Sequence, residues 1–329
     1  MKALRGFFRC IGLIGFIAFA ATGRAQDAAS NSMKIDDASG KSGNTIPDAE
    51  KIDELIQNNN LRALSGSTSK WSMASAWNYN GGTVKTPFAE DRPDISQASA
   101  TTAKADLDGN VSAKYNIDVK NSLMAGVGLR WIAPLAKNGP HDYDGTTFDV
   151  QNPYLQYQYL YNWKVQSVLQ AQVMQWTQAD STALGYQTQY NVDQENMYEI
   201  GKSGFSIGAS IWGEFTTFNK TGSYLAADDP NHLDDVRSAQ NDWQFGLVPE
   251  LEYQLTEKLN LRTLVSLFVF EHYRNAASNT FVHDKVFQSI GIGWSVTRDI
   301  FLYPNVQFLP NQVASNLTNV GVSATVNVF

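Results

Sequence analysis

Acidic side chains recur at alternate positions in three segments of the chain where polar and apolar residues alternate. Asp193 and Glu195 stand two residues apart in the first segment. Glu214 lies in the second, and Glu250 and Glu252 stand two apart in the third. Side chains two residues apart point to the same face of a β-strand, so each pair presents its carboxylates on one side. Such a face can hold fixed negative charge toward water.

Basic residues occupy the corresponding polar face in other segments, including Lys104 and Lys114. We expect this polar face to point inward, toward water. Separated charge of both signs on a water-facing wall orders water and selects solutes in a pore. A solvated wall with local ion pairs is the alternative interpretation. The candidate lumen residues are therefore Arg130, Lys164, Asp193, Glu195, Glu214, Glu250, Glu252 and Arg262.

The segments that must position these side chains have a hydrophobic period of two, which is the main signal for half-buried strands. The period begins after Ser69 and continues almost to the end of the chain. The segments are residues 69–80, 97–118, 121–134, 147–162, 163–178, 183–200, 203–219, 239–256, 259–275, 282–296, 299–311 and 315–329. Asp108 and Gly109 form a hairpin dipeptide within the second segment, but the apolar residues keep their phase across it, so we predict one strand there.

The connections between these segments alternate in length. Five are short, near 118–121, 162–164, 200–204, 256–259 and 297–299, whereas most of the others are longer and polar. Outer-membrane barrels show this asymmetry, with short periplasmic turns and long external loops. The sequence predicts an all-β fold, a transmembrane antiparallel up-and-down β-barrel of about 12 strands with a short N-terminal helix.

The N-terminal region divides the chain into three parts. Residues 1–25 combine three early basic residues, an apolar stretch and a small-residue end, which is the pattern of a secretory signal peptide. Residues 26–68 are predicted to form a flexible linker and one short amphipathic helix that starts after Pro47. This helix is either a periplasmic stalk or a plug inside the barrel. Residues 69–329 form the predicted barrel. The only cysteine, Cys10, lies in the signal segment, so no disulfide is expected.

The charge balance excludes one class of partner. Four of the 25 basic residues lie in the signal segment, leaving 21 against 32 acidic residues and a net charge of −11. Nucleic acid requires clustered basic side chains, so it is not an expected partner. An acidic segment could hold a divalent cation, although a solvated loop explains it as well; its residues are Asp228, Asp229, His232, Asp234 and Asp235. We predict no metal and no cofactor.

The chain ends in an alternating strand, with Val320, Val322, Val326 and Val328 on one face and Phe329 as the last residue. A terminal Phe on such a strand resembles the C-terminal insertion signal of bacterial outer-membrane porins and related barrels. The resemblance covers residues 69–329 by pattern. It implies location in the outer membrane of a Gram-negative cell, contact with outer-membrane lipid, and recognition of the last strand by the barrel assembly machinery.

A barrel of this size also resembles outer-membrane phospholipases, which use serine and histidine at the outer rim. The chain offers His141, His232, His272 and His283, two of them near Ser278 and Ser289. No matching motif surrounds them, so we predict no enzymatic activity. The leading prediction is a passive channel for small hydrophilic solutes with a weak preference for cations. A structural or adhesive barrel with a blocked lumen is the alternative, and a hydrolase the next.

Overall fold

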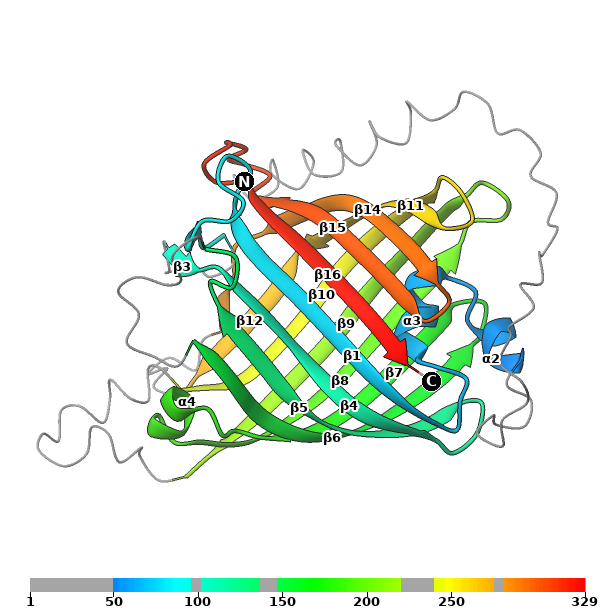
Figure 1. Cartoon of the computed structure of the whole chain (residues 1–329), viewed down its shortest axis with the longest axis horizontal. Coiled ribbons are helices and arrows are strands. Elements are labelled where there is room, and N and C mark those ends of the chain that lie inside the picture. Colours follow the sequence, from blue (N-terminus) through cyan, green and yellow to red (C-terminus); the bar gives the residue numbers. More distant parts are fainter. Residues whose placement is uncertain (1–49, 96–101, 137–146, 220–239, 275–280, 329) are drawn as a thin grey trace, which may run out of the picture.

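The computed structural model describes residues 50–95, 102–136, 147–219, 240–274 and 281–328 (Figure 1). The predicted signal peptide, the linker up to residue 49, the acidic segment at 228–235, Ser278 and Phe329 lie outside the described residues. None of the described helices has the length and apolarity required to cross a membrane.

The described strands form a closed antiparallel barrel, which confirms the predicted fold. The first half of its wall comprises β1 (Trp71–Thr83), β4 (Asp106–Asn116), β5 (Asn121–Ile132), β6 (Phe148–Asn162), β7 (Gln166–Gln175), β8 (Tyr186–Glu199) and β9 (Phe205–Phe218). The second half comprises β10 (Asn241–Gln254), β11 (Leu259–Ser266), β12 (Phe268–Tyr273), β13 (Phe281–His283), β14 (Phe287–Thr297), β15 (Ile300–Phe308) and β16 (Asn319–Val328). The ring closes where β16 pairs with β1.

Two of the wall strands are interrupted but continuous in register. Leu259 pairs with Trp294 near the base of one hairpin, and Phe270 pairs with His283 in the same register near its tip. The N–H of Asp284 donates to the carbonyl oxygen of Val269 at 2.9 Å, which joins the two parts. β11 with β12 and β13 with β14 therefore each count as one wall strand, and the described barrel has twelve.

The two ends of the barrel differ. The five predicted short turns all lie at one end, together with the C-terminal end of β16, and we call this end the turn side (Figure 1). The helices α2 (Glu50–Leu55) and α3 (Asn59–Ser65) lie there as well. The opposite end, the loop side, carries α4 (Ala179–Ala183) and a hairpin of β2 (Asp91–Pro93) and β3 (Thr102–Lys104).

Two predicted positions require correction. The segment 97–118 is continuous across Asp108 and Gly109, as predicted, but β3 pairs with β2 in a separate two-stranded sheet and is not part of the barrel wall. Lys104 accordingly forms ion pairs with Glu90 at 2.5 Å and Asp91 at 3.0 Å instead of lining the lumen. Lys164 lies in the exposed turn between β6 and β7, with a φ of 73°, so it is not on a strand.

Candidate functional site

The candidate site is the barrel lumen, whose wall is set by the alternation of side chains. On the outer face, Leu155 is 58% exposed and Ile211 is 50% exposed. The neighbouring positions of the same strands point inward and are mainly polar. Strand pairing then places inward residues side by side, since Glu214 of β9 lies opposite Gln244 of β10, and Gln244 lies opposite Glu271 of β12.

These inward side chains on the loop side form a row that contains two hydrogen-bonded groups. The amide of Gln189 donates to the carboxylate of Glu214. The amide of Gln244 donates to Oε1 of Glu271 at 3.0 Å, and the hydroxyl of Tyr273 donates to its Oε2 at 2.5 Å. The row is amide-rich and acidic, so it offers hydrogen bonds and negative charge to whatever fills the lumen.

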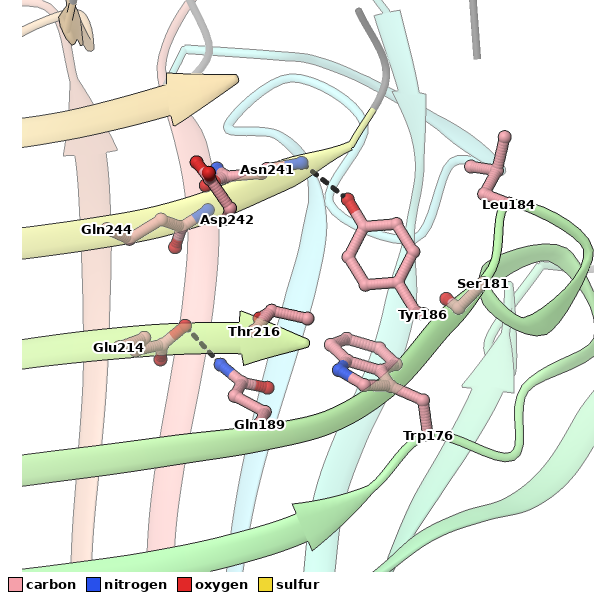
Figure 2. A pocket seen from close by; sticks show the side chains of 10 residues that line it. All are labelled: Trp176, Ser181, Leu184, Tyr186, Gln189, Glu214, Thr216, Asn241, Asp242 and Gln244. Atoms are coloured by element: carbon pink, nitrogen blue, oxygen red, sulfur yellow. Dashed lines mark hydrogen bonds between the residues drawn. The ribbon is translucent and has the colours of Figure 1, made fainter. Parts of the chain in front are cut away.

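A cavity of about 450 Å³, which we call the rim cavity, opens beside this row at the loop side (Figure 2). Its lining is Trp176, Ser181, Leu184, Tyr186, Gln189, Glu214, Thr216, Asn241, Asp242 and Gln244. A second cavity of about 440 Å³ shares Gln244 with it and is lined from β9 through β16, with Arg262, Glu271, Ser289 and Tyr303 among its residues. The lumen therefore contains open space from the loop side down to Arg262, lined by polar and apolar side chains.

Two of the predicted lumen residues lie on β8, on the same inward phase as Gln189. The hydroxyl of Ser210 lies 3.3 Å from Oδ1 of Asp193 and donates to it. Glu195 lies opposite Ser210 in the strand pairing. Arg130 lies on the other wall, where its Nη2 is 3.0 Å from Oδ2 of Asp106.

The other predicted charges form a compact cluster farther toward the turn side. Nη2 of Arg262 lies 2.6 Å from Oε2 of Glu250, and its Nε lies 3.3 Å from Oε1 of Glu252. The guanidinium also stands over the ring of Tyr303, 5.2 Å from its centroid. All three charged side chains are at most 9% exposed. We call Glu250, Glu252 and Arg262 the buried triad, which is a paired structural group facing little water.

The N-terminal helices occupy the turn-side mouth directly below this triad. α3 contacts β7 and β15, which are six strands apart in a ring of twelve and so lie on opposite walls. We call residues 50–65 the plug. The amide nitrogen of Asn58 donates to the buried carboxylate of Glu252 at 2.7 Å, which connects the plug to the triad. The structure therefore places this segment inside the mouth, as a plug instead of a stalk.

Polar wall residues hold the plug from several directions. The backbone N–H groups of Gln57 and Asn58 donate to Oε1 of Gln166 at 2.6 and 2.8 Å. The carbonyl oxygens at the end of α3 accept from three strands, namely from Asn327 to Ala63, from Gln158 to Leu64 and from the ammonium of Lys114 to Ser65. Arg298, in a turn, donates to Asp53 at 2.9 Å and to the carbonyl of Gly66 at 2.8 Å. The orphan carbonyls at the helix end are thereby satisfied.

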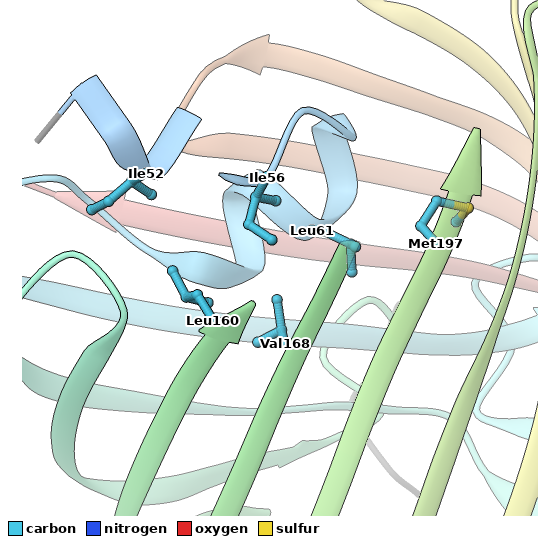
Figure 3. Close-up of a cluster of buried hydrophobic side chains, with 6 residues drawn as sticks. All are labelled: Ile52, Ile56, Leu61, Leu160, Val168 and Met197. Atoms are coloured by element: carbon cyan, nitrogen blue, oxygen red, sulfur yellow. The ribbon is translucent and has the colours of Figure 1, made fainter. Parts of the chain in front are cut away.

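Apolar side chains seal one side of the plug (Figure 3). Ile52, Ile56 and Leu61 pack against wall residues in a cluster completed by Leu160, Val168 and Met197. Ile56, Leu61, Val168 and Met197 have no exposed surface. Burial of these side chains, together with the hydrogen bonds above, gives the plug a fixed position in the mouth.

The sequence predicts one helix after Pro47, but the structure divides it in two at Gln57 and Asn58. Asn58 is the N-cap of α3, because its Oδ1 accepts from the N–H groups of Asn60 and Leu61 at 3.0 and 3.1 Å. Within the described ranges, no group of three or more His, Cys, Asp or Glu side chains is arranged to hold a metal ion.

Comparisons with known proteins add the following. No family model matches the chain, and no curated protein matches it in sequence. Among solved structures, the chain is similar to an outer-membrane channel from Pseudomonas putida F1, with a TM-score of 0.46 and 8% identity over 80% of this chain and 97% of that one. It is also similar to the KdgM porin in complex with disordered oligogalacturonate (TM-score 0.40, 7% identity, 78% and 98% covered) and to the NanC porin (TM-score 0.38, 9%, 78% and 98%).

Proposed function

We propose that this protein is a porin-like channel of the bacterial outer membrane, through which small hydrophilic solutes diffuse passively. The observation that carries the proposal is the closed barrel with a polar inner face that encloses open space on the loop side. A twelve-stranded barrel is wider than the filled eight-stranded type and narrower than the general porins. Small solutes fit this intermediate width.

The outer face supports a membrane location. Leu155, Val192, Ile207 and Ile211 each expose half or more of their surface on it. A contiguous apolar belt of this kind is rare on soluble monomers and suits the lipid-facing band of a barrel. Exposed tryptophans at the strand ends, such as Trp71, match the aromatic girdles at the interfaces. Export by the signal peptide and assembly through the strand that ends at Phe329 complete the proposal.

The plug supports the structural or adhesive barrel as the second candidate. It crosses the turn-side mouth from wall to wall, and Glu252 of the buried triad contacts it through Asn58. Both features narrow the lumen at one end. They fit a channel of low conductance as well as a barrel that passes no solute.

Electrical recording separates the two candidates. The purified full-length protein, inserted into a planar bilayer, is expected to give discrete conductance steps. Insertion is checked by the shift in gel mobility that folded barrels show before heating. A silent protein that has inserted and folded correctly would contradict the channel and favour the structural barrel.

We also propose that the channel weakly prefers cations. Asp193, Glu195, Glu214 and Glu271 lie on the inward phase of β8, β9 and β12, and within the described part of the chain no basic side chain forms an ion pair with them. Arg130 and Arg262, by contrast, are paired with carboxylates. The field on the loop side is therefore negative and attracts cations ahead of anions.

A further inference from the structure

We propose that the rim cavity is a binding site for an uncharged polyhydroxylated solute the size of a mono- or disaccharide. The inference rests on the proposed channel function, because the site would hold the solute at the loop-side entrance before it passes on. The cavity volume of about 450 Å³ falls within the range of roughly 300–1,000 Å³ that small-molecule sites occupy.

Five elements build the cavity and fix its shape. Trp176 follows β7, α4 contributes Ser181, β8 contributes Tyr186 and Gln189, β9 contributes Glu214 and Thr216, and β10 contributes Asn241, Asp242 and Gln244. Strand pairing holds β7 to β10 in register. The lining residues are thus preorganised on rigid strands, which favours a specific ligand over a generally wet surface.

Two aromatic rings form one side of the cavity (Figure 2). Trp176 and Tyr186 meet edge to face with their ring centroids 5.2 Å apart, and Tyr186 packs on Phe218 at 4.7 Å in the same manner. The hydroxyl of Tyr186 accepts the backbone N–H of Asn241 at 3.0 Å, which fixes its ring. A rigid ring beside polar groups provides an apolar platform for the C–H face of a sugar.

The remaining lining offers both donors and acceptors from uncharged groups. Gln189, Gln244, Asn241, Thr216 and Ser181 supply amides and hydroxyls. A hydroxyl group both donates and accepts, so a polyol can bond to both kinds of group.

The charges of the cavity disfavour anionic solutes. The carboxylate of Glu214 accepts from the amide of Gln189, and Oδ1 of Asp242 lies 2.5 Å from Nδ1 of His272. No lysine or arginine is among the residues that line it in the described ranges. An anionic solute would therefore meet negative charge without a counter-charge, whereas the hydroxyl groups of an uncharged polyol can donate to these carboxylates. The site therefore favours an uncharged ligand over an anionic one.

Three sugars of similar shape and different charge test the inference. D-glucose, D-glucosamine and D-glucuronate are titrated against the full-length protein in detergent, and binding is followed by calorimetry and by intrinsic tryptophan fluorescence. We expect glucose to bind, glucosamine to bind no more tightly, and glucuronate to bind at least tenfold more weakly. Tightest binding of glucosamine would identify an organic-cation site, and equal binding of all three would mean no selective site. Either result would overturn the inference.

Variants locate the binding in the cavity. Trp176→Ala should weaken glucose binding about tenfold, and Thr216→Val, which keeps the side-chain shape, should weaken it several-fold. Trp163→Ala is the matched control, because Trp163 is 81% exposed in a turn at the opposite end. Folding of each variant is verified by gel mobility. Unchanged affinity in both cavity variants would place the sugar elsewhere and refute the site.

The two proposals fail separately. Equilibrium binding does not require an open lumen, so a silent barrel that binds glucose would refute the channel and leave the site intact. A conducting barrel that binds no glucose would refute the site and leave the channel intact.

Discussion

The two halves of the lumen use the same strand pattern for different purposes. On the turn side, the inward polar groups meet the plug and one another, and the buried triad of Glu250, Glu252 and Arg262 is at most 9% exposed. On the loop side, inward groups such as Gln189 and Gln244 line cavities of about 450 and 440 Å³. Alternating polar residues on a strand thus specify a face that points into the barrel. Whether this face packs against the plug or lines an open cavity depends on which part of the chain contacts it.

This difference has an energetic consequence. A charge pair in the packed half has lost its water, so removal of one partner leaves the other buried without compensation. A pair in the open half keeps water nearby and contributes little to stability. Paired substitutions in the two halves should therefore separate the roles of the two regions.

The largest expected effect is on Arg262. Arg262→Met should lower the free energy of unfolding by about 3–5 kcal/mol, because it leaves Glu250 and Glu252 buried without a counter-charge. The control is Arg130→Met on the loop side, where the arginine side chain is 37% exposed and its partner Asp106, 8% exposed, keeps the amide of Asn80 as a donor, so its loss should cost less than the loss of Arg262. Urea unfolding of the barrel in lipid vesicles measures both. Equal losses would remove the distinction between the halves.

The next effect compares the outer and inner faces of the wall. Ile211→Arg or Leu247→Arg should destabilise the inserted barrel by roughly 2–4 kcal/mol, because the charge would face lipid near mid-membrane. Gln170→Arg or Gln172→Arg should be tolerated, since the pairing of Gln172 with Gln156 places it on the inward phase. The folded fraction in phospholipid vesicles is the measurement. Equal tolerance of both sets would contradict the barrel topology.

A smaller effect is expected at Asn58, which both caps α3 and donates to Glu252. Asn58→Ala should loosen the plug by about 1–2 kcal/mol. Asn58→Ser keeps a capping oxygen and should cost less, whereas Asn58→Asp keeps the cap but places a second carboxylate beside Glu252. Hydrogen exchange of the α3 amides reports the loosening. Exchange rates in all three variants that equal those of the unmodified protein would mean that Asn58 does not anchor the plug.

The smallest effect concerns ion selectivity. Replacing Glu214 by Gln and Asp193 by Asn should reduce the cation preference measured as a reversal potential in a salt gradient. Concentrated salt should reduce it again, because the screening length is about 10 Å at 0.1 M and shorter above that. Glu257→Gln, in an exposed turn outside the wall, is the control. An anion preference in the unmodified protein would refute the charge assignment.

The strand order and phases could be predicted from the sequence because each strand carries its own signal. A period of two and five short turns are local features, and they give twelve wall strands without knowledge of contacts. The pairing of Glu252 with Arg262 was also within reach, since the tight turn at 256–259 fixes the register that places them opposite each other. The triad could thus have been recognised as paired.

The remaining features depend on contacts distant in the sequence. Lys104 continues the inward phase but pairs with Glu90 and Asp91 in a separate hairpin. Lys164 continues the alternation of the segment 163–178 in the sequence. However, β7 begins only at Gln166, so Lys164 lies in the turn before it. The wall residues that hold the plug, such as Gln166 and Asn327, have the same polar pattern as residues that face solvent. Their role depends on where a helix more than 100 residues away docks.

Single-channel recording with and without the plug tests the central claim most directly. The full-length protein and a variant lacking residues 50–65 are compared in planar bilayers after gel mobility confirms that both barrels are folded, with Glu54→Gln, an exposed position on the plug, as a control that leaves it in place. We expect small conductance steps from the full-length protein and from the control, and unitary steps several-fold larger from the deletion. Steps of equal size in all three would show that the plug does not lie in the path of the current, contrary to its position across the turn-side mouth.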